Sequence, residues 1–268
     1  MARSQAAGTT RPVSDDSLLI RNCHGLDEMR ACVLLQKEVW NFADIELVPL
    51  RMFVVGEKIG GQVVGAFDRG ELVGFAFAIP GVRHGCSFLH SQMLAVRQPY
   101  RNSGLGRRLK LFQREDALVR GFELMEWTFD PLEIKNAYLN LEKLGAIVRR
   151  YNINLYGVTS SLLQAGLPTD RLVAEWWLSS NRVETLLATG AKPAFQVLEA
   201  ISVPAGIYDW KAKPETRNRA LALQGKNREA FLKAFAEGLA VLGYERDAQG
   251  NGRFLLGRWE EERGSPSS

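Results

Sequence analysis

Several features that would assign a protein to a class at first sight are missing from this sequence. Its 268 residues include only three cysteines, Cys23, Cys32 and Cys86. They are widely spaced, form no metal-binding or redox motif, and favour a reducing compartment. No apolar run approaches the roughly 20 residues that span a membrane, and the polar start MARSQAAGTTRPVSDDS lacks the apolar region of a signal peptide. We therefore expect a cytoplasmic protein with no membrane partner and with flexible tails over residues 1–16 and 260–268.

The chain also carries little net charge. The formal net charge is only +4, and no lysine block or basic–aromatic repeat accompanies it, which argues against nucleic acid as a partner. The same mild excess of positive charge suits a polyanionic cofactor. Hydrophobic residues make up 46% of the chain, enough for the core of one large domain or of a domain with a sizeable extension.

The most informative stretch covers residues 87–121. Its pattern predicts a strand over residues 88–96, a tight glycine turn, and a helix that starts at Leu105 and ends at Gly121. A glycine turn that opens a helix after a strand presents several free N–H groups at the positive end of the helix dipole, which suits phosphates. The basic residues around the turn are Arg101, Arg107, Arg108 and Lys110.

Several interpretations of this turn compete. A P-loop requires Lys and then Ser or Thr after its last glycine, but Gly106 is followed by Arg107 and Arg108. A dinucleotide fingerprint requires a third glycine where Leu109 stands, so this interpretation is weak. The segment RNSGLG, residues 101–106, fits [QR]-x-x-G-x-[GA] and resembles the acyl-CoA pyrophosphate loop of the GNAT N-acyltransferase superfamily. An ordinary β–α turn with surface arginines is the alternative.

A second segment, WTFDPLEIKNAYLNLEKLGA, resembles the second GNAT motif, whose usual ending is close to Y-x-K-x-G-F. The resemblance implies an α/β fold of the GNAT acyl-CoA N-acyltransferase type, with a mixed, mostly antiparallel sheet flanked by helices. It covers residues 18–157, and we expect a GNAT core over residues 17–180. We expect residues 181–268 to form an α/β C-terminal extension packed on the core, because the chain also resembles a bacterial subgroup of predicted acetyltransferases that carry such an extension.

Periodicity and turn residues predict the other elements. Strands are expected over residues 18–21, 61–67, 71–79, 123–129, 146–156, 171–179, 195–202, 243–246 and 253–257. Helices are expected over residues 26–40, 51–59, 134–144, 183–189 and 214–242. Pro80 and Gly81 are expected to end the third strand.

The resemblance implies which residues hold the acyl-CoA. Backbone groups of Leu94, Ala95 and Val96 would pair with the pantetheine arm, which enters between two splayed strands. The pyrophosphate would accept bonds from N–H groups in the turn, with Arg101 and Arg107 as charge contacts; the turn residues are Asn102, Ser103, Gly104, Leu105, Gly106 and Arg107. Asn136 is a further candidate contact with the cofactor arm, with an ordinary first-turn polar residue as the alternative.

Acyl transfer to an amine needs a base for the ammonium and an acid for the departing thiolate, and needs no metal. Strand alternation predicts that His90, Gln92, Leu94 and Val96 share one face. His90 is the candidate base because its ordinary pKa suits the task, although a strand histidine can be purely structural. Asp130 is the second candidate base; its alternative role is a cap before Pro131.

The candidate acid is less clear. In many GNAT enzymes it is the tyrosine four residues before the motif glycine, and Leu141 stands there. Tyr138, one helical turn earlier, is the nearest phenol, with core packing as its alternative.

The sequence thus predicts CoA-dependent transfer of an acyl group, such as acetyl, directly to an amine of a small molecule such as an amino acid. A non-catalytic acyl-CoA-binding module is the alternative, because of Leu141. A nucleic-acid-binding protein is the third and weakest hypothesis. A homodimer is left open.

Overall fold

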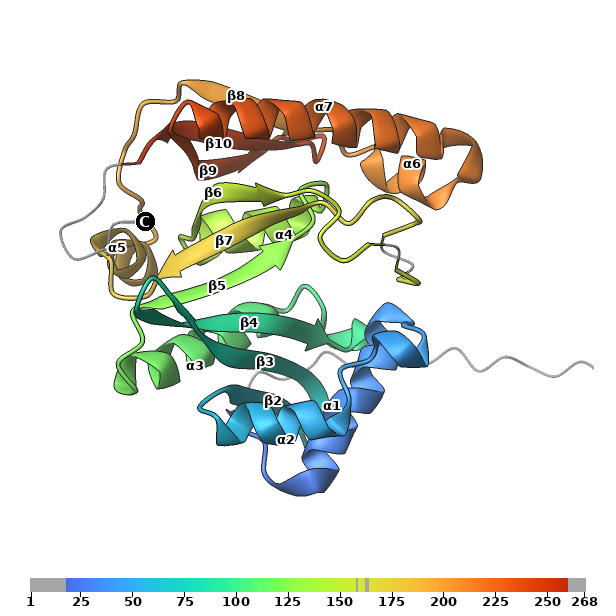
Figure 1. Ribbon diagram of the computed structural model, residues 1–268, viewed down its shortest axis with the longest axis vertical. Coiled ribbons are helices and arrows are strands. Elements are labelled where there is room, and N and C mark those ends of the chain that lie inside the picture. The colour runs from blue at the N-terminus through green and yellow to red at the C-terminus, as the bar shows by residue number, and fades with distance from the viewer. Residues whose placement is uncertain (1–17, 158, 162–163, 260–268) are drawn as a thin grey trace, which may run out of the picture.

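The computed structural model describes residues 18–157, 159–161 and 164–259. These residues form one ten-stranded sheet in the order β1-β2-β3-β4-β5-β7-β6-β9-β10-β8 (Figure 1). Only the β4–β5 pair is parallel among the pairs of this sheet. The strands are β1 (Leu18–Asn22), β2 (Gln62–Asp68), β3 (Glu71–Arg83), β4 (Cys86–Val96), β5 (Leu124–Phe129), β6 (Ile147–Asn152), β7 (Arg171–Trp177), β8 (Glu199–Val203), β9 (Leu239–Arg246) and β10 (Gly252–Arg258). The predicted mixed, mostly antiparallel sheet is confirmed.

Helices cover both faces of the sheet (Figure 1). The longer ones are α1 (Gly25–Trp40), α2 (Leu50–Lys58), α3 (Leu105–Val119), α5 (Asn181–Thr189) and α7 (Arg217–Ala236). The short ones are η2 (Asp44–Glu46), η3 (Gln98–Tyr100), α4 (Ile134–Tyr138), the π-helical turn η4 (Leu139–Lys143), α6 (Ile207–Ala212) and η5 (Pro214–Thr216). None of the described helices is both long and apolar enough to cross a membrane.

Strand alternation in β2 separates two layers of core. Val63 and Phe67 pack with α1 and α2, whereas Val64 and Ala66 pack with Leu105 and Leu109 of α3. The two sides of this part of the sheet are called the α1/α2 face and the α3 face below.

In the first half of the chain, the helices and strands agree closely with those expected from the sequence, with one clear error in strand β3. Pro80 and Gly81 were expected to end the third strand, but β3 continues through them to Arg83, with Pro80 opposite Leu89 of β4. The pairing of β2 with β3 stops at Ala78. Beyond that point the described part of β3 has a strand on one side only, and an edge tolerates a proline.

The errors in the second half are larger. Strand β6 ends at Asn152, so the prediction for residues 153–156 was wrong, and β8 begins four residues later than expected. The long predicted helix ends at Ala236, and α6 was missed. Gly238 has φ +77, which suits glycine and breaks the helix; the buried residues that follow it form β9.

Residues after 180 join the rest through the sheet and through buried charges. Strand β9 pairs with β6 at Val148 and Val241. The buried Arg182 of α5 donates to the carbonyl oxygens of Gly145, at 3.0 Å, and Leu242. Lys211 of α6 is buried and reaches Asp130 at 3.2 Å and Glu133 at 2.7 Å.

The Lys211 contacts generate a stability prediction. Lys211→Met keeps the length of the side chain but leaves the buried Asp130 carboxylate without its cation. We expect a loss of about 3 kcal/mol in the free energy of unfolding, measured by urea denaturation of the full chain, with one cooperative transition. Lys233→Met removes an exposed Lys233–Glu237 pair and serves as the control, with a change of about 0.5 kcal/mol or less. Equal losses in both variants, or two separate transitions, would contradict the prediction.

Candidate active site

The glycine turn before α3 has the geometry of an anion cradle. Gly104 takes φ +85 at the start of the helix, and a Cβ placed there would meet nothing within 4 Å. Asn102 also has a positive φ of 64. A residue with a side chain is strained at φ +85, so glycine is required there. The first N–H groups of α3 have no partner within the helix, and they open onto the exposed turn.

The side chains of the turn are fixed to backbone on either side. Arg101 Nε donates to the Val96 carbonyl at 3.0 Å, and Arg107 Nε donates to the Lys143 carbonyl at 3.3 Å. Ser103 Oγ donates to the Tyr100 carbonyl at 2.7 Å. Two of the predicted charge contacts, Arg101 and Arg107, thus stand at the mouth of the turn, one beside the end of β4 and one beside η4.

Strands β4 and β5 are joined over a very short length. Their parallel pairing covers only Leu89 with Met125 and His90 with Glu126. Strand β4 nevertheless stays paired with β3 as far as Val96. The edge of β4 that faces β5 therefore has no strand partner after His90 among the described residues, and this open edge leads directly to the glycine turn. Leu94, Ala95 and Val96, the predicted pantetheine contacts, lie on it.

A β-bulge corrects the predicted faces of β4. Phe77 lies opposite Met93 and Ala78 lies opposite Ser91, so Gln92 is an extra residue. An extra residue reverses the alternation. Leu94 and Val96 consequently pack on the α3 face and Met93 on the α1/α2 face.

His90 falls on the other side of the bulge. Ser91 points to α3, where its hydroxyl donates to Gln113 at 3.0 Å, so its neighbour His90 points to the opposite face. The prediction that His90 shares a face with Leu94 and Val96 was wrong, because the sequence pattern does not show the bulge. Gln92 is exposed at the bulge.

The environment of His90 is partly buried and charged. Burial lowers the pKa of the imidazole, and the carboxylate of Glu126, its neighbour across the pairing with β5, opposes that effect. The charges of Lys110, Arg150 and Arg83 add to the lowering. The net effect favours the neutral form of the imidazole.

Asp130 has both carboxylate oxygens occupied. Oδ1 accepts a bond from the Leu132 N–H at 2.8 Å, and Oδ2 lies 3.2 Å from Lys211 Nζ. The side chain is buried. These contacts match the capping role named as its alternative, and Lys211, which comes 81 residues later, adds an ion pair that the sequence did not suggest.

Tyr138 and Asn136 lie on α4, close to the start of α3. Asn136 is exposed and Tyr138 is half-buried. The Tyr138 ring lies between two cations, with Lys143 Nζ 5.2 Å and the Arg246 guanidinium 5.7 Å from its centroid. Leu141 is 0% exposed and belongs to the core. The π-helical turn η4 follows, and its Leu139 approaches the space beside Gly106; such turns are frequent at functional sites.

The prediction that Lys110 adds positive charge around the glycine turn was wrong, because its amine is buried beneath the bulge. Lys110 of α3 is 2% exposed, donates to Ser91 Oγ at 2.7 Å, and lies 3.6 Å from the centroid of the Trp127 ring. Burial holds its pKa well below the usual range. The signal in the sequence was weak, because a lysine in an amphipathic helix is usually assigned to the surface.

Glu126 was also missed, and here the sequence did carry a signal. It stands in the apolar run ELMEWTF, where a carboxylate can be buried only if it is paired. It is 5% exposed and bonds Arg83 and Arg150. Burial works to raise its pKa, but the bonds and charges of the two arginines outweigh burial and lower it.

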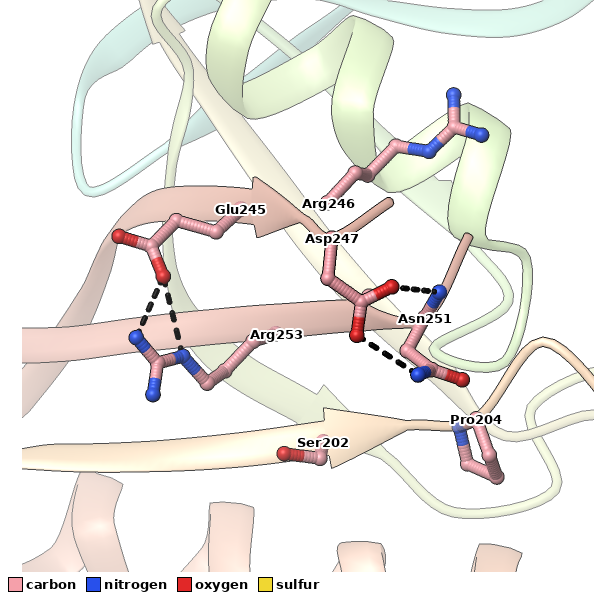
Figure 2. Close-up of a pocket in the computed structure, with 8 residues that line it drawn as sticks. Ser202, Pro204, Glu245, Arg246, Asp247, Asn251 and Arg253 are labelled. Atoms are coloured by element: carbon pink, nitrogen blue, oxygen red, sulfur yellow. Dashed lines mark hydrogen bonds and ion pairs between the residues drawn. The ribbon is translucent and has the colours of Figure 1, made fainter. Parts of the chain in front are cut away.

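A hollow of about 570 Å³ lies at the other end of the sheet, on β8, β9 and β10. Figure 2 shows two pairs of polar side chains turned toward each other, Glu245 with Arg253 and Asp247 with Asn251, while Arg246 points away from them. Asp247 bonds Asn251 at 2.7 Å, and Glu245 bonds Arg253 at 2.5 Å. Because these groups satisfy each other, this hollow is not a candidate for chemistry.

No protein-family model and no curated protein matches this sequence. Solved structures of acetyltransferases are similar to the chain in fold. A GNAT family acetyltransferase from Elizabethkingia anophelis with acetyl-CoA bound is 15% identical and covers 61% of this chain and 99% of its own, with a TM-score of 0.46. A GNAT family acetyltransferase from Streptococcus pneumoniae is 17% identical and covers 59% and 98%, with a TM-score of 0.48. The ribosomal-protein-S18-alanine N-acetyltransferase from Escherichia coli is 18% identical and covers 61% and 95%, with a TM-score of 0.47. Each of these structures leaves more than a third of this chain uncovered. None of them identifies the substrate of this chain.

Proposed function

We propose that the protein is a CoA-dependent N-acyltransferase that moves an acyl group, such as acetyl, to an amine of a small molecule such as an amino acid. The observation that carries the proposal is the open edge of β4 running directly into the glycine turn of α3. An extended amide chain can pair with such an edge as an added strand. Phosphates fit the N–H groups at the end of that edge. Acyl-CoA combines these two features, and bound there it supplies an activated thioester.

The turn residues have the properties that this cofactor needs. Asn102, Ser103 and Gly104 are exposed, and no side chain stands over Gly104. A Cβ at Gly106 would meet nothing closer than 3.7 Å. Arg101 and Arg107 keep part of their guanidinium groups free of the backbone bonds described above, since each of those bonds uses Nε. We assign the pyrophosphate to this turn, and Leu94, Ala95 and Val96 to the pantetheine arm.

We further propose that His90 accepts the proton of the acceptor ammonium. It lies on the face of β4 opposite α3, next to the bulge where the paired part of β4 and β5 ends. Its lowered pKa favours the neutral form, which a base requires, at the cost of some basicity. Tyr138 is the proposed proton donor to the thiolate, because Leu141 has no proton to give.

A non-catalytic acyl-CoA-binding module remains the second candidate function. The observation that favours it is Leu141, which fills the usual position of the acid and is fully buried. Incubation of the protein with acetyl-CoA and a panel of amines separates the two functions. Release of free thiol that depends on the amine supports the enzyme, whereas tight binding of acetyl-CoA without thiol release supports the module.

The loop assignment generates a binding prediction. Gly104→Asp places a side chain at φ +85 and a negative charge in the phosphate cradle. We expect a loss of acetyl-CoA affinity of roughly 100-fold or more, measured by isothermal titration calorimetry. Gly190→Asp is the control, because Gly190, the C-cap residue of α5, also has a positive φ of 77 and open space around it. If Gly104→Asp binds acetyl-CoA as well as the control does, the turn is not the phosphate site.

The chemistry generates a pH prediction. If neutral His90 is the base, kcat/KM is constant at high pH and falls as the pH drops through the histidine pKa. The midpoint lies below the ordinary value of 6.5, since burial lowers it. His90→Gln keeps hydrogen bonding but cannot titrate there, and should lower kcat roughly 100-fold.

Asp130→Asn is the matched control for that experiment. Both oxygens of Asp130 have structural partners, so we expect reduced stability with kcat within a few-fold of wild type. A large loss of kcat in Asp130→Asn with an active His90→Gln would transfer the role of base to Asp130. Small effects in both variants would show that water carries the proton and that the site acts by positioning.

A further inference from the structure

The amine of Lys110 lies where β4 and β5 stop pairing. The last paired residues are His90 and Glu126, so Ser91 of β4 and Trp127 of β5 are the first positions that remain unpaired. Both side chains point to α3. Lys110 Nζ donates to Ser91 Oγ at 2.7 Å and lies 3.6 Å from the centroid of the Trp127 ring. The amine therefore contacts both strands at the first position at which they are separate.

Pairing that continued in register would place Ser91 beside Trp127. Paired strands lie about 4.8 Å apart, so two side chains that face the same helix at this position would contact each other. Lys110 contacts both of them, and its two contacts constrain where each side chain lies. Closer approach of the strands would require the amine to give up this position.

The two side chains that flank the amine are each held by a further contact. Ser91 Oγ donates to Gln113 Oε1 of α3 at 3.0 Å, and both residues are buried. The Trp127 ring packs edge-on against Trp176 of β7, with the ring centroids 5.9 Å apart. The amine therefore lies among groups that are themselves fixed, and its position is set by α3, β4 and β5 together.

An amine in this position costs the fold stability. The Lys110 residue is 2% exposed, and in the described part of the chain no carboxylate forms an ion pair with its Nζ. A buried amine whose partners are a hydroxyl and an aromatic ring is poorly compensated for the loss of water. A methionine of similar length would fill the same space without that cost. The amine therefore contributes something other than stability.

We propose that Lys110, through its contacts with Ser91 and Trp127, holds β4 and β5 apart and keeps the edge of β4 open for the pantetheine arm before the cofactor binds. The inference rests on the proposed function and deepens it by naming a positioning residue. The bulge at Gln92 turns β4, but it lies in the pairing with β3. Lys110 acts on the other side of the strand, where β5 would otherwise follow. An edge that is already open costs less free energy to occupy.

These contacts need a nitrogen donor as well as a long side chain. An amine donates to the Ser91 hydroxyl whether or not it is protonated, and N–H groups as well as cations are attracted to the face of an aromatic ring. Methionine has no donor, so Ser91 Oγ would lose its contact with residue 110. Arginine keeps both kinds of contact, because a guanidinium group donates hydrogen bonds and stacks on aromatic rings. The two substitutions thus separate the length of the side chain from its chemistry.

The first experiment measures amide hydrogen exchange by NMR in the full chain without CoA. In Lys110→Met, the N–H groups of residues 91–96 that face β5 should exchange roughly 10-fold or more slowly than in the wild type, because the strands pair further. Lys233→Met, which replaces an exposed lysine of α7, should leave this exchange unchanged. Unchanged exchange in Lys110→Met would overturn the proposal and show that the bulge alone keeps the edge open.

The second experiment compares stability with acetyl-CoA affinity. Lys110→Met should raise the midpoint of urea denaturation, because a buried amine is removed, and should weaken acetyl-CoA binding roughly 10-fold in calorimetry, because the edge must first be opened. Lys110→Arg should bind acetyl-CoA more tightly than Lys110→Met although it is the less stable of the two. A residue that only supports the fold would lose stability and affinity together. A parallel loss in Lys110→Met, or failure of that variant to fold, would therefore contradict the proposal.

The third experiment tests the route through Ser91. Ser91→Ala removes the acceptor of the Lys110 bond and should also weaken acetyl-CoA binding, and its loss combined with that of Lys110→Met should be less than additive. Fully additive losses would contradict an action of Lys110 through Ser91. If the wild type binds no acetyl-CoA, the proposed function fails, whereas the exchange measurement still decides whether Lys110 holds the two strands apart.

Discussion

The arrangement of the sheet depends on strand β4, which is hydrogen-bonded along its length to one neighbouring strand and only briefly to the other. Strand β4 pairs with β3 along its whole length but with β5 over only two residues. Backbone N–H and C=O groups left without partners are costly when they are shielded from water. The open edge is therefore both a weakness in the sheet and a template for an extended ligand. The open edge leads into the glycine turn at the start of α3, so the unpaired backbone groups of the strand and of the helix terminus lie close together in the chain.

The bulge at Gln92 reverses the alternation of side chains along β4, so residues before and after it point to different faces of the sheet. Below it, His90 is turned to the face opposite α3; above it, Leu94 and Val96 are turned into the α3 core. Without the extra residue, His90 would point to the same face as Leu94 and Val96. The bulge also marks where pairing with β5 stops, so the same local defect opens the strand and orients the imidazole.

The local sequence pattern was sufficient to predict the structure wherever the conformation of a short segment depends on its own residues. The turn at Gly104, the start of α3 and the β2–β3 hairpin could all be predicted from residue type and spacing. The errors occurred where a distant neighbour decides. Pro80 stays in β3 because β2 has already ended beside it. Residues 239–242 form a strand because β6 offers an edge 93 residues earlier in the chain, where Val148 pairs with Val241. The Asp130–Lys211 contact joins two segments whose proximity no local pattern encodes. The sequence alone therefore could not decide whether Asp130 acts as a base or as a cap.

Glu126 opposes the other influences on the proposed base. Burial and the charges of Lys110, Arg150 and Arg83 lower the pKa of His90, and the charge of Glu126 raises it. Glu126 is itself buried and is held by Arg83 and Arg150. If Glu126 were removed, the cations would act on the imidazole unopposed, so its pKa would fall further and it would be a weaker base. The carboxylate beside His90 therefore limits how much basicity the imidazole loses by being buried.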